Sequence, residues 1–185
     1  RNAMAVDLAK LSLWLVTLAK DHPFTFLDHS IRCGDSVVGL TQKQIAAFTW
    51  ELNTAGKQRI LGQDRLERQI ERATEKRREI LEGGDLILPA LKAQLLRNAD
   101  EALDEARFVG DLIVAAYFSA DKDRARREKL EELRDRCVAW HTSKPFDPTL
   151  KPSDVVSALR AGPRSVLSFH WSIEFPEVFG RENGG

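Results

Sequence analysis

The chain has 185 residues, of which 43% are hydrophobic and 30% are charged, so it is long and apolar enough for one domain with a buried core. Its 28 Lys and Arg residues balance its 28 Asp and Glu residues, which excludes a generally basic nucleic-acid coat and an acidic tail but leaves room for a local charged patch. Its two cysteines, Cys33 and Cys137, are too few and too far apart for a disulfide framework or a zinc cluster. We therefore expect a reduced, cytoplasmic setting.

The first forty residues have the pattern of part of an α/β unit, a helix followed by an extended segment. Residues 3–20 are apolar around much of the helix surface, and such a helix is normally buried against a sheet or other helices. Its apolar stretch is too short to span a bilayer. Residues 24–33 are rich in Phe, Thr and Ile, which favours a strand, and Gly34-Asp35 follows as a turn.

A long helix is predicted next. Thr41 and Gln44 have the spacing of a capping box, and an apolar stripe with charged flanks follows them. We expect residues 41–81 to form one helix, bent near Gly56 or Gly62.

Three further helices are predicted after the Gly83-Gly84 break. A second apolar stripe over residues 88–116 has the same spacing as the first, so the two helices should pair antiparallel. A charged helix over residues 121–140 should turn Leu130, Leu133 and Cys137 inward. Its opposite charges nearly cancel, which is more typical of a solvated face than of a DNA-binding surface. A proline-rich linker, a short helix over residues 153–161 and a strand over residues 165–169 complete the chain.

Few residues carry a signal for chemistry. Asp111 lies inside an apolar run, and we expect an arginine to pair with it. Glu174 and Glu177 flank a proline and are expected to cap or solvate a turn. Cys33 and Cys137 are expected to be packing residues. No metal site is expected, because none of the four histidines is spaced i,i+4 from another: His22, His29, His141 and His170.

Asp35 has a position that suits ligand binding. It follows a predicted strand, and ligands in open α/β sheets bind beyond the carboxyl ends of the strands. A carboxylate there can accept a hydrogen bond from an amino group such as that of adenine. Gly34-Asp35 is equally an ordinary turn pair.

Three segments resemble parts of N6-adenine DNA methyltransferases of the restriction–modification and phage-exclusion type. Residues 2–15 are similar to the helix after the second cofactor-binding motif. Residues 26–39, FLDHSIRCGDSVVG, are similar to the strand and loop of the third motif. Residues 169–179, FHWSIEFPEVF, are similar to the stretch before the catalytic Asn-Pro-Pro-Tyr loop, and residues 110–118 resemble a helical insertion between these motifs.

The resemblance implies a Rossmann-like domain that binds S-adenosylmethionine. The third-motif acid, which contacts the adenine of the cofactor, would be Asp35, with Gly34 and Cys33 beside it and Arg1 near the same ring. The target adenine would be flipped out of the DNA, and its N6 would attack the methyl sulfonium in line, so that positioning supplies most of the catalysis.

The chain lacks the glycine-rich first motif, the acid of the second motif and the Asn-Pro-Pro-Tyr loop. We therefore expect a mainly α chain in which a long antiparallel helical hairpin or bundle is inserted into a piece of a Rossmann-like α/β methyltransferase domain. Residues 1–40 would belong to the cofactor-binding domain, residues 41–162 to the insertion, and residues 163–185 to the segment that returns to the missing catalytic loop. Alone, the chain should not catalyse; in the full-length protein it would act with S-adenosylmethionine on DNA, without a metal or a membrane. The alternative is a helical interaction module that docks a partner protein or a DNA backbone.

Overall fold

The computed structural model describes residues 2–16, 27–52, 63–83, 87–161 and 165–179, and these are mainly helical. In these ranges the chain forms no strand, but one isolated parallel bridge joins Asp35 to Ser168. The helices are α1 (Ala3–Val16), α2 (Gln42–Ala46), α3 (Gln63–Gly83), α4 (Pro89–Phe118), α5 (Asp123–Thr142), the 3-10 turn η3 (Pro148–Leu150), α6 (Ser153–Arg160), α7 (Trp171–Glu174) and α8 (Pro176–Phe179).

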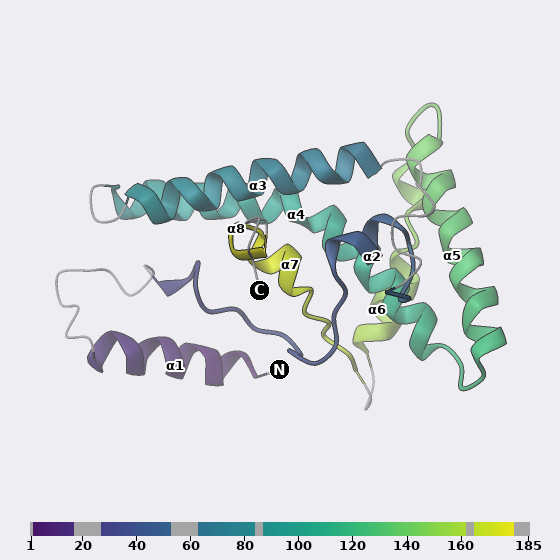
Figure 1. Cartoon of the computed structure of the whole chain (residues 1–185), viewed down its shortest axis with the longest axis horizontal. Coiled ribbons are helices and arrows are strands. Elements are labelled where there is room, and N and C mark those ends of the chain that lie inside the picture. The colour runs from purple at the N-terminus through teal and green to yellow at the C-terminus, as the bar shows by residue number, and fades with distance from the viewer. Residues whose placement is uncertain (1, 17–26, 53–62, 84–86, 162–164, 180–185) are drawn as a thin grey trace.

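The centre of the molecule is an antiparallel pair formed by α3 and α4, which lie side by side in Figure 1. Ala73 of α3 and Ala106 of α4, which belong to the predicted stripes, are fully buried, and so are Ala99 and Leu103 of α4. Small residues at such positions let two helices approach closely. The predicted hairpin is confirmed, although α3 ends at Gly83 and Gly84 lies outside the described residues.

The second half of α4 is covered by α5 and α6. Leu130, Leu133 and Cys137 point inward from α5 as predicted, and the Trp140 ring packs edge-on against Phe108 at 5.6 Å. The short helix predicted after the proline-rich linker is α6. These helices form the core of the chain.

The prediction of one helix over residues 41–81 is wrong. The capping box at Thr41 and Gln44 is present, but the helix that it starts, α2, ends at Ala46. Phe48 then adopts a left-handed backbone conformation, with φ +49°, and places its ring in the core. The buried Gln44 amide holds this turn by donating to the Trp50 carbonyl at 2.7 Å. The bends expected at Gly56 and Gly62 lie outside the described residues.

The predicted strands are not formed in the described part of the chain. Residues 24–26 are not described, Leu27 to Ser30 form a turn closed by a 3.0 Å backbone hydrogen bond, and residues 31–33 are irregular. Residues 165–169 contribute only the bridge at Ser168. A strand needs a neighbour along its length to accept its backbone hydrogen bonds, and in the described residues such pairing joins only residues 35–38 to residues 167–169.

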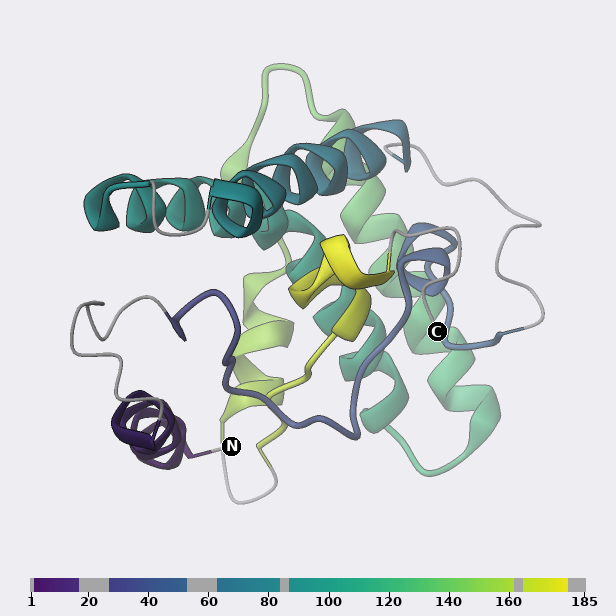
Figure 2. The same cartoon turned by 60° about the vertical axis from the view of Figure 1, so that its left-hand side comes forward.

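Helix α1 is apolar but exposed, which contradicts the expectation that it is buried. None of its residues is buried, and Met4 and Val16 are 70% and 80% exposed. It lies apart from the other helices in both Figure 1 and Figure 2. Lys10 ties it to the next segment through a 2.8 Å ion pair with Asp28. Residues 17–20 of the predicted helix lie outside the described residues.

Candidate functional site

The turn that contains Asp35 lies against the segment that follows α6. The Asp35 N–H donates to the Leu167 carbonyl at 2.8 Å, and the Phe169 N–H donates to the Val38 carbonyl at 2.7 Å. Figure 2 shows the two segments meeting below α7 and α8. Two stretches that are separated in the sequence by α2 to α6 are therefore neighbours in space.

Two glycines permit this contact. A Cβ at Gly34 would overlap the Phe169 ring, and a Cβ at Gly39 would overlap the Phe169 carbonyl. Only glycine leaves room for the Phe169 ring at the first position and for the Phe169 backbone at the second.

Asp35 itself is half-buried within the turn. Its Oδ1 accepts from the Val37 N–H at 3.3 Å, and its carbonyl accepts from the Val38 N–H at 3.0 Å. The carboxylate thus lies at a partly exposed turn, with Gly34 and the half-buried Cys33 before it. Arg1, the fourth residue that the resemblance implicates, lies outside the described residues.

An aromatic cluster packs beside this turn. The Trp171 ring meets Phe169 edge-on at 4.8 Å and lies 6.0 Å from Phe175. The indole N–H of Trp171 donates to the Ser36 carbonyl at 3.0 Å. The sequence shows the density of aromatic residues here, but not that their partner is the turn at residues 33–36.

Asp111 of α4 anchors the returning segment. Its Oδ2 lies 2.5 Å from Arg160, which confirms the predicted arginine partner, and its Oδ1 accepts from the Ser168 hydroxyl. His170 Nε2 lies 3.4 Å from Oδ1, and His170 Nδ1 accepts from the Leu40 N–H at 3.0 Å. Burial alone would raise the pKa of the Asp111 carboxyl. The hydrogen bonds from His170 and Ser168, with the nearby charges, have the larger effect, so that this pKa is lowered.

This group is not a nucleophile triad. The Ser168 hydroxyl donates to the carboxylate rather than to the imidazole, and the imidazole nitrogen that would act as a base already accepts a backbone N–H. The cluster instead fixes the position of residues 168–170 on α4.

Glu177 was expected at a solvated turn, and this expectation is wrong. It forms a bidentate pair with Arg77 of α3, at 2.7 and 2.8 Å, and both side chains are more than 90% buried. Arg77 also donates to the His29 carbonyl at 2.7 Å. One guanidinium thus joins α3, α8 and the segment before the Asp35 turn.

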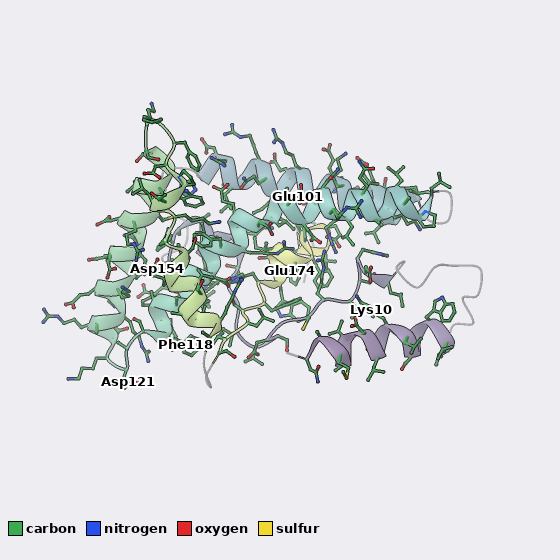
Figure 3. The ribbon with its side chains drawn as sticks, turned by 180° about the vertical axis from the view of Figure 1, so that it is seen from behind. Lys10, Glu101, Phe118, Asp121, Asp154 and Glu174 are labelled. Atoms are coloured by element: carbon green, nitrogen blue, oxygen red, sulfur yellow. The ribbon has the colours of Figure 1, made fainter. Side chains whose placement is uncertain are left out.

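Glu174 is likewise paired rather than solvated. Arg107 of α4 binds it at 2.7 and 3.0 Å and also contacts Asp100, which in turn pairs with Arg32 at 2.7 Å. In Figure 3 Glu174 lies in the middle of the molecule beside α4, whereas Asp121 lies at its edge. Burial alone would lower the pKa of Arg107, but the hydrogen bonds and charges of Glu174 and Asp100 together have the larger effect, so that the pKa is raised. Two linked ion pairs, Arg107 with Glu174 and Asp100 with Arg32, therefore tie both segments to α4.

Cys137 is buried as expected, but it has a neighbouring base that our sequence analysis missed. His141, one helical turn later, places Nδ1 3.6 Å from the Cys137 sulfur and Nε2 2.6 Å from Glu105. Hydrogen bonds with the Cys137 thiol and with Glu105 raise the pKa of His141 to about 10. The i,i+4 spacing of a cysteine and a histidine was the available signal. The group links α4 to α5, away from the Asp35 turn.

Several charges of α5 pair with one another, which suits the solvated face that the sequence predicts, while Arg127 and Arg136 also pair with Glu51 and Asp154 outside the helix. Arg124 pairs with Glu128 at 2.8 Å, and Lys129 with Glu132 at 2.8 Å. Such exposed pairs contribute little stability.

Two surface hollows lie away from the Asp35 turn. One surface hollow lies between residues 47–51 and α5, and another lies between α3 and Pro176. Within the described ranges no three His, Cys, Asp or Glu side chains are placed to hold a metal ion, and no helix is both long and apolar enough to cross a bilayer.

Comparison with known proteins gives no match. No family model matches the chain, and neither the curated proteins nor the solved structures include one that is significantly similar to it. Its function must therefore be inferred from its own residues.

Proposed function

We propose that this chain is part of a DNA adenine-N6 methyltransferase, in which a methyl group passes from S-adenosylmethionine to a flipped adenine. In this proposal Asp35, with Gly34 and Cys33 beside it, borders the adenine of the cofactor. The chain alone is inactive, because it has no Asn-Pro-Pro-Tyr loop to hold the target base.

One observation carries the proposal. The segment that resembles the third cofactor motif and the segment that resembles the approach to the catalytic loop lie side by side, joined by the 2.7 Å hydrogen bond from the Phe169 N–H to the Val38 carbonyl. A long insertion fits within a domain only if it leaves and re-enters at nearby points. The helical part of this chain meets that requirement.

Two further features support an α/β parent domain. The bridge between Asp35 and Ser168 is parallel, and parallel sheets form only where other elements cover both faces. The exposed leucines of α1 are an apolar surface of the kind that packs against such a sheet: Leu8, Leu11, Leu13 and Leu15. The rest of the domain would supply this covering.

For methyl transfer, these residues need only hold the cofactor in position. S-adenosylmethionine supplies an activated methyl group; the N6–methyl bond forms as the sulfur–methyl bond breaks, and N6 then loses a proton. Asp35 is suited to accept a hydrogen bond from the amino group of the cofactor's adenine, which would hold that end of the cofactor in place.

Replacing the carboxylate tests the proposal. In the complete enzyme, Asp35→Ala should weaken S-adenosylmethionine binding about tenfold or more, because a buried polar group of the ligand loses its partner. Asp121→Ala is the matched control, since Asp121 is an exposed aspartate next to α5. Equal affinity of the Asp35→Ala enzyme and the wild type in isothermal titration would contradict the assignment.

A further inference from the structure

We propose that Trp171, which lies outside the cofactor motifs, forms a stacking wall for the purine ring of the cofactor next to Asp35. This inference rests on the proposed function and adds a binding residue to it. Trp171 begins α7, three positions after Ser168, which bridges to Asp35.

The indole is fixed with respect to the Asp35 turn. Its N–H donates to the carbonyl of Ser36, the residue after Asp35, at 3.0 Å. This hydrogen bond uses the polar edge of the ring, while the side chain as a whole stays 45% exposed. An exposed, oriented indole beside a carboxylate offers an aromatic face and a hydrogen-bond acceptor at one place.

Neighbouring rings hold the indole in this orientation. Phe169 meets it edge-on, with an interplanar angle of 74°, and itself fits against Gly34. Phe175 also lies near it, with ring centroids 6.0 Å apart and 31° between the planes, and it is 6.1 Å from Phe169 and beneath the Arg77 guanidinium. A ring that is already ordered loses little conformational entropy when a ligand binds.

The chemistry of the surface favours a purine nucleoside. Stacking on an aromatic side chain accepts any flat base, whereas the carboxylate favours a base with an amino group on its edge. Adenine meets both conditions. The methionine part of the cofactor is not flat and has no ring that could stack on the indole.

The test compares cofactor affinity in the complete enzyme and its variants. Trp171→Ala should weaken S-adenosylmethionine and S-adenosylhomocysteine about tenfold each, because both carry the same ring. Trp171→Phe should restore most of the affinity, because a phenyl ring still offers an aromatic face. Trp50→Phe, which changes a tryptophan in the turn after α2, is the matched control and should leave affinity unchanged.

A spectroscopic measurement makes the test independent of variant folding. In enzyme labelled with 5-fluorotryptophan, the resonance that Trp171→Phe removes should shift when S-adenosylmethionine is added, while that of Trp50 should stay in place. A Trp171 resonance that does not move at saturating cofactor overturns the inference, whether or not Trp171→Ala folds.

The outcomes separate the two proposals. If Asp35→Ala weakens binding and Trp171→Ala does not, the stacking role is wrong and the proposed function stands. If Trp171→Ala weakens binding and Asp35→Ala does not, Trp171 is a wall of the site and the role of Asp35 is wrong. If the wild-type enzyme binds no S-adenosylmethionine, the proposed function fails and this inference fails with it.

Discussion

The buried pair between Arg77 and Glu177 should be among the most sensitive points of the fold. Its side chains are 1% and 7% exposed, and the guanidinium makes two hydrogen bonds to the carboxylate and one to the His29 carbonyl. Arg77→Met leaves the Glu177 carboxylate buried without its cation, which costs about 3–5 kcal/mol. This is a large share of the 5–15 kcal/mol that typically separates folded from unfolded domains.

Urea denaturation followed by circular dichroism measures this cost. The double variant Arg77→Met, Glu177→Leu should be more stable than Arg77→Met alone, because no uncompensated charge remains buried. Lys76→Ala removes the neighbouring exposed pair with Glu79 and is the control, expected to leave the urea midpoint unchanged. A loss below about 1 kcal/mol for Arg77→Met, or a double variant no better than the single one, would refute the reasoning.

Two further predictions concern α4 and α5. A Cβ at Gly110 would lie 2.5 Å from His170 Nε2, so Gly110→Ala should displace the imidazole and cost about 1–3 kcal/mol in urea denaturation; no measurable loss would show that His170 does not depend on this contact. Because the pKa of His141 is raised from 6.5 to about 10, its proton stabilises the folded chain fully below pH 6.5, and this contribution is lost as the pH rises towards 10. Urea midpoints should therefore fall over this range, and His141→Gln should flatten the fall; an unchanged slope would contradict the assignment.

Periodic patterns were the part of the fold that could be predicted. The apolar stripes that become α3 and α4, the inward face of α5 and the short helix α6 all follow from i,i+3 and i,i+4 spacing. The arginine partner of Asp111 followed from the cost of burying a lone carboxylate, although its identity as Arg160 did not.

The features of the fold that the sequence did not predict depend on contacts between residues that are distant in the sequence. The break after Ala46 is held by a hydrogen bond from the buried Gln44 to Trp50 and by the left-handed conformation of Phe48, and no local propensity signals either. Strand propensity is a preference for half-buried, paired backbone, and of the described residues 27–33 and 165–169 only Ser168 forms a bridge.

The same limit applies to the candidate site. Cys33, Gly34 and Asp35 were identified because they are adjacent in sequence and resemble a motif. The sequence could not place Trp171 beside them, because its hydrogen-bond partner, Ser36, is 135 residues away in the sequence. The sequence also suggested turn positions for Glu174 and Glu177, because the arginines that bind them are on α4 and α3, far away in the sequence.

Methyl transfer by the complete gene product tests the central claim most directly. The protein is incubated with S-adenosylmethionine and adenine-containing duplex DNA, and the DNA is digested and examined for N6-methyladenine by mass spectrometry. The account predicts N6-methyladenine with the wild-type protein and a marked loss at low cofactor concentration with Asp35→Ala. No N6-methyladenine from a complete, folded gene product on any adenine-containing sequence tested would contradict it.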